Sequence, residues 1–338
     1  MKNHFNFVFT VLIFLLTFTS CVSIVPHVVK DVKIRDVCTL LCFKSKAIGR
    51  GKLEPKRLGK ICVSIPDSYV NFPERRYPVI YALPGFGDSA LSMIEPIRQD
   101  LKEMHNQTEF IIVSIDGGNC LGGSFFSNSP ATGNWEDLVV REAVTLTDSR
   151  YRTIAEPQSR MLAGFSMGGF AAWNIALKHP DVFCAAWACC PGAWDENGLK
   201  DTLKSWDSTY KNAYGAAFSP DITKQFPFAR IPKFNGTEED AAVISGWEQG
   251  FGGIHEKLSA YQKKDIKLTS ISFAFGSHDP YPWIPRGTKY IAQAMADAGL
   301  PVAIKEYQSG HEMTDTIIRT SFIPDVDSIF AGKAVKEK

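Results

Sequence analysis

The chain has 338 residues, of which 45% are hydrophobic and 22% charged, and its formal net charge at pH 7 is +1. This composition is ordinary for a soluble globular protein, and the length suffices for one large α/β domain with a sizeable core. No basic run or stripe stands out, which argues against nucleic acid or another polyanion as a partner.

The N-terminal residues have the pattern of a secretory signal peptide. A positive charge at Lys2 precedes an almost wholly apolar run at 7–18, and small polar residues follow. The run is short for a membrane span, with an uncleaved signal anchor as the alternative. The segment ending at Cys21 also resembles a bacterial lipobox, although its first position lacks the usual leucine. We expect a signal peptide at 1–20, a single domain at 21–338 outside the cytoplasm, and membrane attachment only through a lipid on Cys21.

The eight cysteines show no C-x-x-C pair of the kind that binds metals, and we expect no metal site. Three of them lie in 184–190, which has the pattern of a central strand, so buried thiols are expected there. Cys38 and Cys42 could each meet Cys62 across neighbouring N-terminal strands. An oxidising compartment would allow one disulfide in this group, and the sequence leaves the pairing open.

Two kinds of strand pattern follow each other along the chain. Short apolar runs between residues 30 and 75 alternate with turns and indicate an antiparallel entry to a sheet. Longer apolar runs, mostly separated by helical patterns, then predict a mostly parallel sheet covered on both faces, with ligand sites at the carboxyl ends of its strands. The predicted buried strands are Pro78–Leu83, Phe110–Ile115, Arg160–Phe165, Cys184–Cys189, Ser270–Phe275 and Val302–Tyr307.

Residues 194–264 interrupt this alternation between two predicted core strands. The segment is polar, aromatic and irregular, with prolines at Pro227 and Pro232. We expect an insertion over the end of the sheet. Because long ordered loops in compact domains are usually functional, a cap that shapes a substrate pocket is preferred to a simple surface excursion.

The pentapeptide at 164–168, Gly-Phe-Ser-Met-Gly, lies between a predicted strand and a helical pattern at 169–178. A serine on such a turn is the nucleophile elbow of an α/β-hydrolase, and a plain glycine-rich turn is the alternative. The glycines are needed because strand and helix nearly touch at the turn. The helix N-terminus also directs free N–H groups toward Ser166.

A serine nucleophile needs a base and a group that orients the base, and in this fold the acid precedes the histidine along the chain. His311 follows the last predicted strand and is the candidate base. Asp279 follows the preceding strand and is the candidate acid, with an Asp-Pro turn as the alternative. Backbone N–H groups of Met167 and Phe86 would form the oxyanion hole. This chemistry requires no metal or organic cofactor.

Aromatic residues near the predicted strand ends are candidates for a pocket wall that stacks on a sugar or phenolic ring, although core packing is the default for any one of them. Trp194 and Trp283 are the preferred substrate-binding candidates. Trp135, with Glu136, is expected to pack beneath the site, and substrate binding by Trp135 is the alternative. The further candidates are Trp187, Trp247 and Tyr281.

Several segments together resemble the esterase D-type branch of the α/β-hydrolases, which includes feruloyl and acetyl-xylan esterases, S-formylglutathione hydrolases and mycobacterial mycolyltransferases. The resemblance covers most of the chain from about residue 40 onward, and it is carried by segments 77–87, 133–137, 148–153, 163–169 and 310–311.

The resemblance implies the same roles for the predicted site residues: Ser166 as nucleophile, Asp279 as acid, His311 as base, and Phe86 and Met167 as oxyanion donors. Two positions depart from the pattern of many relatives. A proline occupies position 84, where many carry histidine, and this leaves the backbone donor intact. A glutamate follows the catalytic histidine, where many carry an aromatic or threonine-like residue, and it would alter substrate contacts or the histidine pKa.

The sequence therefore predicts a secreted or lipid-anchored serine carboxylesterase. Its substrates would be small-molecule or carbohydrate esters of acetyl, feruloyl or similar acyl groups, cleaved through an acyl-enzyme. An acyltransferase of the mycolyltransferase type would use the same residues, and a non-catalytic binding protein on a hydrolase scaffold is the alternative of a different class. The natural acyl group and alcohol stay open.

Overall fold

The computed structural model describes residues 25–35, 38–104 and 108–330. The predicted signal peptide and Cys21 lie outside these ranges. Within them, no helix combines the length and apolar character that crossing a membrane requires.

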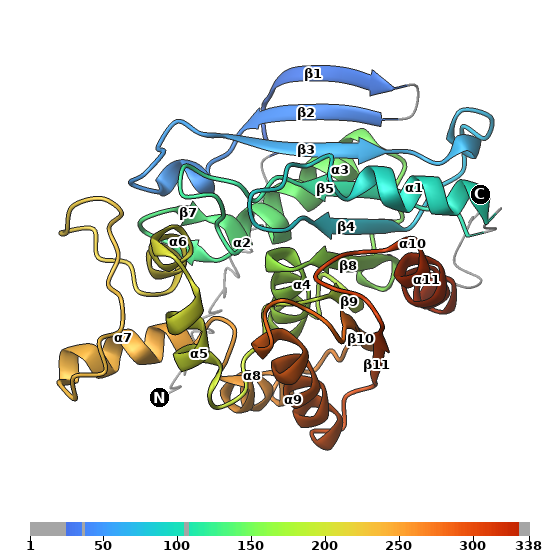
Figure 1. Cartoon of the computed structure of the whole chain (residues 1–338). Helices are drawn as coiled ribbons and strands as arrows, with labels where there is room; N and C mark the ends of the chain where they lie inside the picture. The colour runs from blue at the N-terminus through green and yellow to red at the C-terminus, as the bar shows by residue number, and fades with distance from the viewer. Residues whose placement is uncertain (1–24, 36–37, 105–107, 331–338) are drawn as a thin grey trace, which may run out of the picture.

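The described strands form a nine-stranded sheet in the order β1-β2-β3-β5-β4-β8-β9-β10-β11 (Figure 1). Its first part is antiparallel, from β1 to β3 and from β3 to β5, and the rest is parallel. The antiparallel strands are β1 (Val28–Arg35), β2 (Cys38–Lys44) and β3 (Leu58–Ser64). The parallel strands are β4 (Val79–Leu83), β5 (Ile111–Ile115), β8 (Arg160–Phe165), β9 (Ala185–Cys189), β10 (Ser270–Gly276) and β11 (Val302–Tyr307).

The predicted antiparallel entry and the six strands are confirmed, with one-residue differences at some ends. The prediction that all six are buried is wrong for β11, which is the edge strand of the sheet and is exposed or half-buried along its length. β4, β5 and β9 are buried along their whole length, as expected for parallel strands covered on both faces. A separate two-stranded ribbon, β6 (Asn128–Ser129) with β7 (Gly133–Asn134), lies outside the main sheet.

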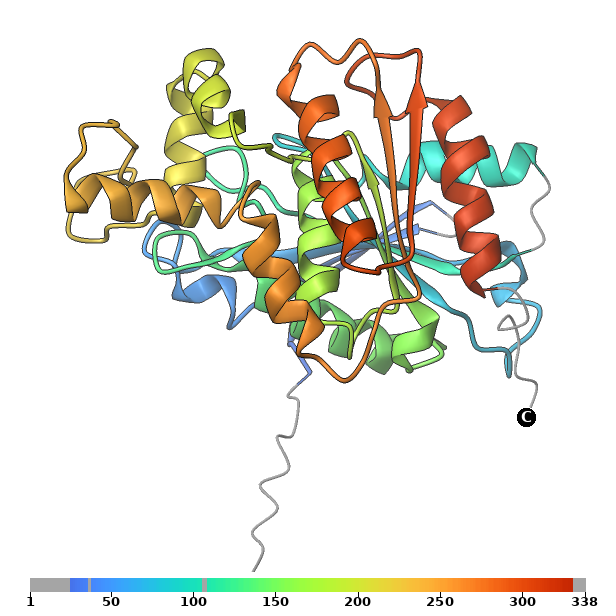
Figure 2. The same ribbon diagram turned by 90° about the horizontal axis from the view of Figure 1, so that it is seen from below.

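Helices cover both faces of the sheet (Figure 2). α1 and α11 lie on one face, where Arg319, just before α11, donates to Asp100 of α1 with an Nε–Oδ1 distance of 2.6 Å. α4 and α9 lie on the other face. The helices outside the insertion are α1 (Ile94–Glu103), α2 (Trp135–Asp137), α3 (Val144–Arg150), α4 (Met167–Lys178), α9 (Trp283–Asp297), α10 (Asp315–Ile317) and α11 (Ile323–Phe330).

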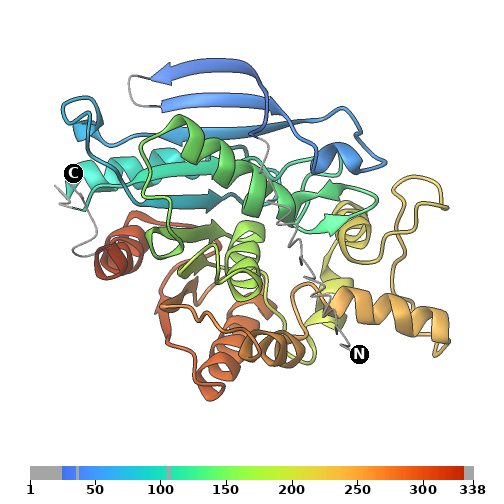
Figure 3. The ribbon, with the colours of Figure 1, turned by 180° about the vertical axis from the view of Figure 1, so that it is seen from behind.

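Residues 194–264 do lie between β9 and β10, but the expectation of irregular structure was wrong for much of the segment, which contains four helices. Figure 3 shows the first three of these helices at one side of the molecule, whereas the fourth packs beside α4 and α9. The irregular part is the Pro- and Gly-containing stretch at 219–237. The helices are α5 (Gly198–Ser205), α6 (Ser208–Phe218), α7 (Glu238–Glu248) and α8 (Ile254–Gln262).

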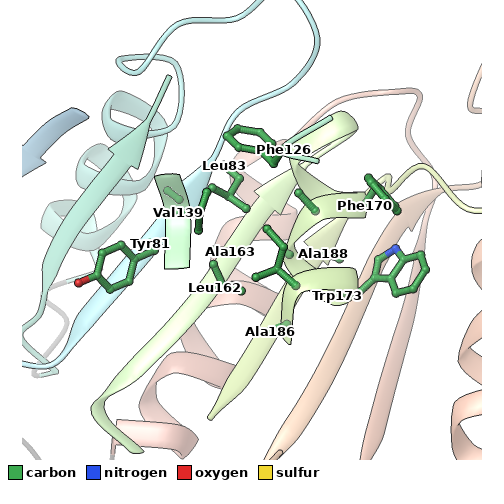
Figure 4. Packing of buried hydrophobic residues seen from close by; sticks show 14 of the residues in the cluster. Tyr81, Leu83, Phe126, Val139, Leu162, Ala163, Phe170, Trp173, Ala186 and Ala188 are labelled. Atoms are coloured by element: carbon green, nitrogen blue, oxygen red, sulfur yellow. The ribbon is translucent and has the colours of Figure 1, made fainter. Parts of the chain in front are cut away.

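A large part of the core forms where α4 packs on the middle of the sheet. α4 is buried from Met167 to Leu177, so no side of this helix faces water. Figure 4 shows Phe170 and Trp173 of α4 close to small strand residues such as Ala188. Small side chains on the strands let the helix approach closely, and the large aromatic rings fill the remaining space. This packing fixes the N-terminus of α4, where the candidate nucleophile lies.

Candidate active site

Ser166 occupies a strained turn between β8 and α4. Its backbone has φ 55° and ψ −113°, a conformation that non-glycine residues seldom adopt and that is found mainly at functional sites. Close packing enforces the turn, because a Cβ atom on Gly164 would overlap the carbonyl group of Gly168. The Ser166 N–H also donates to the carbonyl oxygen of Cys189 at 2.9 Å. The hydroxyl is thereby held at the carboxyl end of the sheet.

The structure brings Ser166, His311 and Asp279 together from the ends of three different strands. The Ser166 hydroxyl lies 2.9 Å from His311 Nε2, and His311 Nδ1 lies 2.7 Å from Asp279 Oδ2. The other carboxylate oxygen of Asp279 accepts the Tyr281 N–H at 2.9 Å. Asp279 is buried, whereas His311 is partly exposed. This chain of hydrogen bonds can pass a proton from the serine to the imidazole and stabilise the resulting cation.

The surroundings of His311 favour its protonated form. Burial acts to lower its pKa, but hydrogen bonds with Asp279 and Cys190 and the Asp279 charge outweigh this effect, and the pKa rises to about 9. The rings of Phe165 and Tyr281 pack beside the imidazole, with centroids 5.1 and 5.4 Å away. These contacts hold the imidazole between the acid and the nucleophile.

The backbone positions predicted for the oxyanion hole both lie at the pocket beside Ser166. Met167 is the first residue of α4, so its N–H has no acceptor within the helix. Phe86 lies in the loop after β4, where the Gly85 N–H donates to Asp88 and the Gly87 N–H donates to Gly122. Gly87 has φ 80°, which glycine adopts without strain.

Ser166 and His311 line a pocket of about 190 Å³, and most of its other lining residues are aromatic. Trp206, Tyr210 and Phe251 come from the insertion, so this segment does border the pocket. Trp206 and Tyr210 stack at 5.7 Å between centroids. The other aromatic lining residues are Phe86, Phe125, Phe165, Tyr281 and Trp283.

The three tryptophans considered for substrate binding occupy different places relative to the pocket. Trp283 lines the pocket as expected. Trp135 is buried away from it and donates through Nε1 to the Thr132 carbonyl at 2.8 Å, so it packs in the core. Trp194 is also buried and is not part of the lining; it lies behind the wall, 6.3 and 6.5 Å from the Trp206 and Trp283 ring centroids. Trp135 thus packs in the core, as expected, and neither Trp135 nor Trp194 belongs to the residues that line the pocket.

Of the remaining candidates, Tyr281 lines the pocket and two tryptophans do not. Trp187 is buried and donates to Ser321 at 3.0 Å, and Trp247 is buried within the insertion, where it donates to Ser219 at 2.8 Å. Sequence reasoning missed Trp206, Tyr210 and Phe251. Tyr210 belongs to α6, whereas Trp206 lies in the link between α5 and α6 with an extended backbone, so no helical spacing relates the two.

One group of potential metal ligands occurs in the described part of the chain: Cys190, Asp279 and His311, whose donor atoms lie within 4.8 Å of one another. Asp279 and His311 are already hydrogen-bonded to each other. The Cys190 thiol faces the backbone on either side of the histidine, with Sγ 3.9 Å from the Gly310 carbonyl oxygen and 3.8 Å from that of Glu312. The arrangement fits a serine nucleophile with its base and acid.

Comparisons with known proteins agree with this geometry. The chain is 25% identical over 285 residues to Esterase Rv1288 of Mycobacterium tuberculosis, covering 80% of this chain and 55% of that protein. It thus spans about half the length of the curated relatives it matches. A solved ferulic acid esterase superposes with a TM-score of 0.60 at 20% identity, covering 87% of this chain and 98% of the other.

The S-formylglutathione hydrolase of Agrobacterium tumefaciens has a similar fold, with a TM-score of 0.59 at 14% identity, covering 90% of this chain and 98% of the other. The family model named Esterase matches residues 54–229, which include β4, the loop after it, and the nucleophile turn. These findings confirm the α/β-hydrolase fold and the resemblance to the esterase D-type branch. The chain belongs to the Esterase family.

Proposed function

We propose that the protein is a serine carboxylesterase that cleaves its substrate through an acyl-enzyme. One observation carries the proposal: the continuous hydrogen-bonded chain from Ser166 through His311 to Asp279 ends at a pocket large enough for a small acyl group. The strained backbone of Ser166 adds support, because strain of this kind persists at functional sites. Membership of the Esterase family supports the same reaction class.

In this mechanism the Ser166 hydroxyl attacks the ester carbonyl while His311 Nε2 accepts its proton. The negative charge on the carbonyl oxygen is stabilised by the N–H groups of Phe86 and Met167. His311 returns the proton to the departing alcohol, which leaves an acyl group on Ser166. A water molecule, deprotonated by His311, then releases the acid and restores the serine. Asp279 keeps the imidazole oriented and stabilises its charged form throughout.

The aromatic pocket wall favours substrates that carry a flat acyl group or a sugar. Aromatic side chains stack favourably on aromatic and sugar rings, and Trp206, Tyr210 and Trp283 offer such faces close to the nucleophile. The fold neighbours include a ferulic acid esterase. We therefore place phenolic acyl esters, free or attached to carbohydrate, first among the substrates. The leader pattern at 1–20 supports a site of action outside the cytoplasm.

The decisive test replaces the nucleophile. Ser166→Ala is expected to abolish both hydrolysis of p-nitrophenyl acetate and labelling by a fluorophosphonate probe. Ser259→Ala removes an exposed serine on α8 and should leave both signals unchanged. Residual turnover by Ser166→Ala at the rate of the control would overturn the proposal, and failure of the probe to label the folded wild-type protein would favour a binding protein.

The substrate class needs a separate test. Methyl ferulate should be cleaved with a higher kcat/KM than methyl acetate, and Tyr210→Ala should narrow that difference because it removes one face of the wall. If Tyr210→Ala lowers kcat/KM by the same factor for both esters, the proposed preference for aromatic acyl groups is rejected. Product analysis with an added sugar alcohol separates hydrolysis from acyl transfer, since a transferase forms a new ester.

A further inference from the structure

Two cysteines on neighbouring strands lie far from the active-site pocket and in unusually close contact. Cys38 opens β2 and Cys62 lies within β3, and their sulfur atoms are 2.9 Å apart. Both side chains are buried. An S–S bond measures roughly 2.0 Å, so the sulfur atoms would have to approach by only about 1 Å to become bonded.

The strand register explains why Cys38 is the partner of Cys62. Leu40 lies directly opposite Cys62, so Cys38 and Cys42 occupy the two diagonal positions on the same face of the sheet. On the pairing pattern alone the two are equivalent candidates. Strand twist makes the diagonals unequal, and the recorded sulfur contact is the one between Cys38 and Cys62.

The remaining described cysteines belong to other parts of the fold. Cys120 is exposed in the loop after β5, and Cys184, Cys189 and Cys190 lie at or within β9. β9 is separated from β3 by β5, β4 and β8 in the sheet. The Cys38–Cys62 contact is thus the place in the described residues where the fold itself positions two sulfur atoms at near-bonding distance.

We propose that Cys38 and Cys62 form a disulfide that joins β2 to β3 in the protein exposed to an oxidising environment. The oxidant is a small-molecule disulfide. One cysteine attacks it, forming a mixed disulfide and releasing one thiol; the second cysteine attacks the mixed disulfide, forming the Cys38–Cys62 bond and releasing a second thiol. The protons of the two cysteines leave on the released thiols, and the two electrons reduce the oxidant.

The timing of the reaction follows from the chemistry of the buried pair. The hydrogen bond with Cys38 and burial raise the pKa of Cys62. Both cysteines are buried in the folded protein. Because an external disulfide must reach a sulfur atom to react, the bond should form faster while the protein folds than in the native protein. The bond closes a loop from residue 38 to residue 62 and restricts the unfolded chain.

Peptide mapping tests the proposal directly. The protein, refolded with oxidised glutathione and digested without reduction, should yield a peptide pair linking Cys38 to Cys62, while Cys42 is recovered alkylated. Oxidised wild-type protein and Cys42→Ser should melt several degrees above their reduced forms. Cys38→Ser and Cys62→Ser should lose the linked peptide and show no such difference.

Recovery of both Cys38 and Cys62 in alkylated form after oxidative refolding would overturn the proposal, as would a linked peptide that pairs Cys62 with Cys42. Hydrolysis of p-nitrophenyl acetate, measured on the same samples, shows whether each variant has folded. Because the disulfide is scored by mass rather than by turnover, its failure is distinguishable from failure of the proposed esterase activity.

Discussion

Gly168 packs directly against the carbonyl group of Leu83, so closely that a Cβ atom at position 168 would overlap it. The contact joins the first turn of α4 to the end of β4, just before the predicted oxyanion loop. The glycine therefore sets the spacing between the nucleophile turn and that loop.

Gly168→Ala should consequently damage both folding and catalysis. Overpacking of this kind typically costs about 1–3 kcal/mol, and the helix start must move away from β4. We expect a lower thermal midpoint and a large loss of kcat, measured by circular dichroism and p-nitrophenyl acetate hydrolysis. Gly49→Ala is the control, because its Cβ would lie 3.4 Å from the nearest atom, in ordinary contact. Wild-type activity in Gly168→Ala would contradict the spacing argument.

Asp279→Asn should reduce kcat by roughly 10³- to 10⁴-fold while the protein stays folded, as loss of an orienting acid does in serine hydrolases. The backbone N–H of Tyr281 already donates to one oxygen of Asp279. An asparagine that keeps this bond must present its NH₂ group to His311 Nδ1, which selects the wrong tautomer for a base. Steady-state kinetics measure the loss, and Asp265→Asn on the exposed surface serves as the control. A change of less than tenfold would remove Asp279 from the proposed role.

The pH dependence of kcat/KM should rise toward alkaline pH. His311 can accept the serine proton only when neutral, and its pKa lies at about 9, above the ordinary 6.5. Activity should therefore grow as pH increases through this range, with the inflection well above 6.5. Asp279→Asn should move the inflection down, because it removes the charge and hydrogen bond that favour the cation. An inflection at or below 6.5 in the wild type would contradict the assignment.

The raised pKa of His311 also affects the stability of the fold. Stability should fall with increasing pH, whereas activity should rise. A pKa that is higher in the folded than in the unfolded protein stabilises the fold at pH values below 6.5, and this contribution disappears as pH rises through about 9. Thermal midpoints of wild type and His311→Gln, compared across this range, should converge at the alkaline end. A difference that persists unchanged would show that protonation of His311 does not stabilise the fold.

Lys257 anchors the turn that carries Phe251 into the pocket. Its ammonium group donates to the carbonyl oxygens of Gln249 at 2.8 Å and Gly250 at 2.9 Å, and also to that of Gly252. Lys257→Met leaves these carbonyls without the donor; an unsatisfied buried group costs about 1–3 kcal/mol, and this applies to Gly250 and Gly252, since Gln249 is exposed.

We expect this change to lower the thermal midpoint and to raise KM for aromatic esters as Phe251 loses its support. Lys267→Met is the matched control, since Lys267 also donates to backbone carbonyls, including that of Gln262 at 2.8 Å, but is exposed. Equal changes of the thermal midpoint and of KM in both variants, measured by calorimetry and ester kinetics, would show that the turn does not depend on the half-buried ammonium group of Lys257.

Much of the fold followed from local sequence pattern. Parallel strands buried on both faces are continuous apolar runs, so β4, β8 and β9 could be located within a residue of their ends. The convergence of Ser166, Asp279 and His311 was also predictable, because the carboxyl ends of parallel strands meet at one edge of the sheet. Their order along the chain then limited which acid and histidine could serve.

The pocket wall was harder to predict because an aromatic residue looks the same in sequence whether it fills the core or lines a cavity. Trp135 and Trp194 are not part of the lining, while Tyr210 reaches the site from α6 and Trp206 from the link between α5 and α6. The four short helices within 194–264 were not predicted, because the turn-forming residues at 219–237 led us to expect irregular structure over the whole segment. Which side of a helix faces a cavity depends on packing between distant segments.

The three side chains of the proposed triad follow strand ends, whereas three aromatic residues of the pocket wall, Trp206, Tyr210 and Phe251, belong to the insertion between β9 and β10. The proposed reaction and part of the proposed selectivity are therefore encoded in different stretches of the gene. Exchange of residues 194–264 with the corresponding segment of a relative is a route to altered preference with an unaltered reaction. Natural variation in this family has the same opportunity: diversity can accumulate in the insertion while the sheet keeps the chemistry constant.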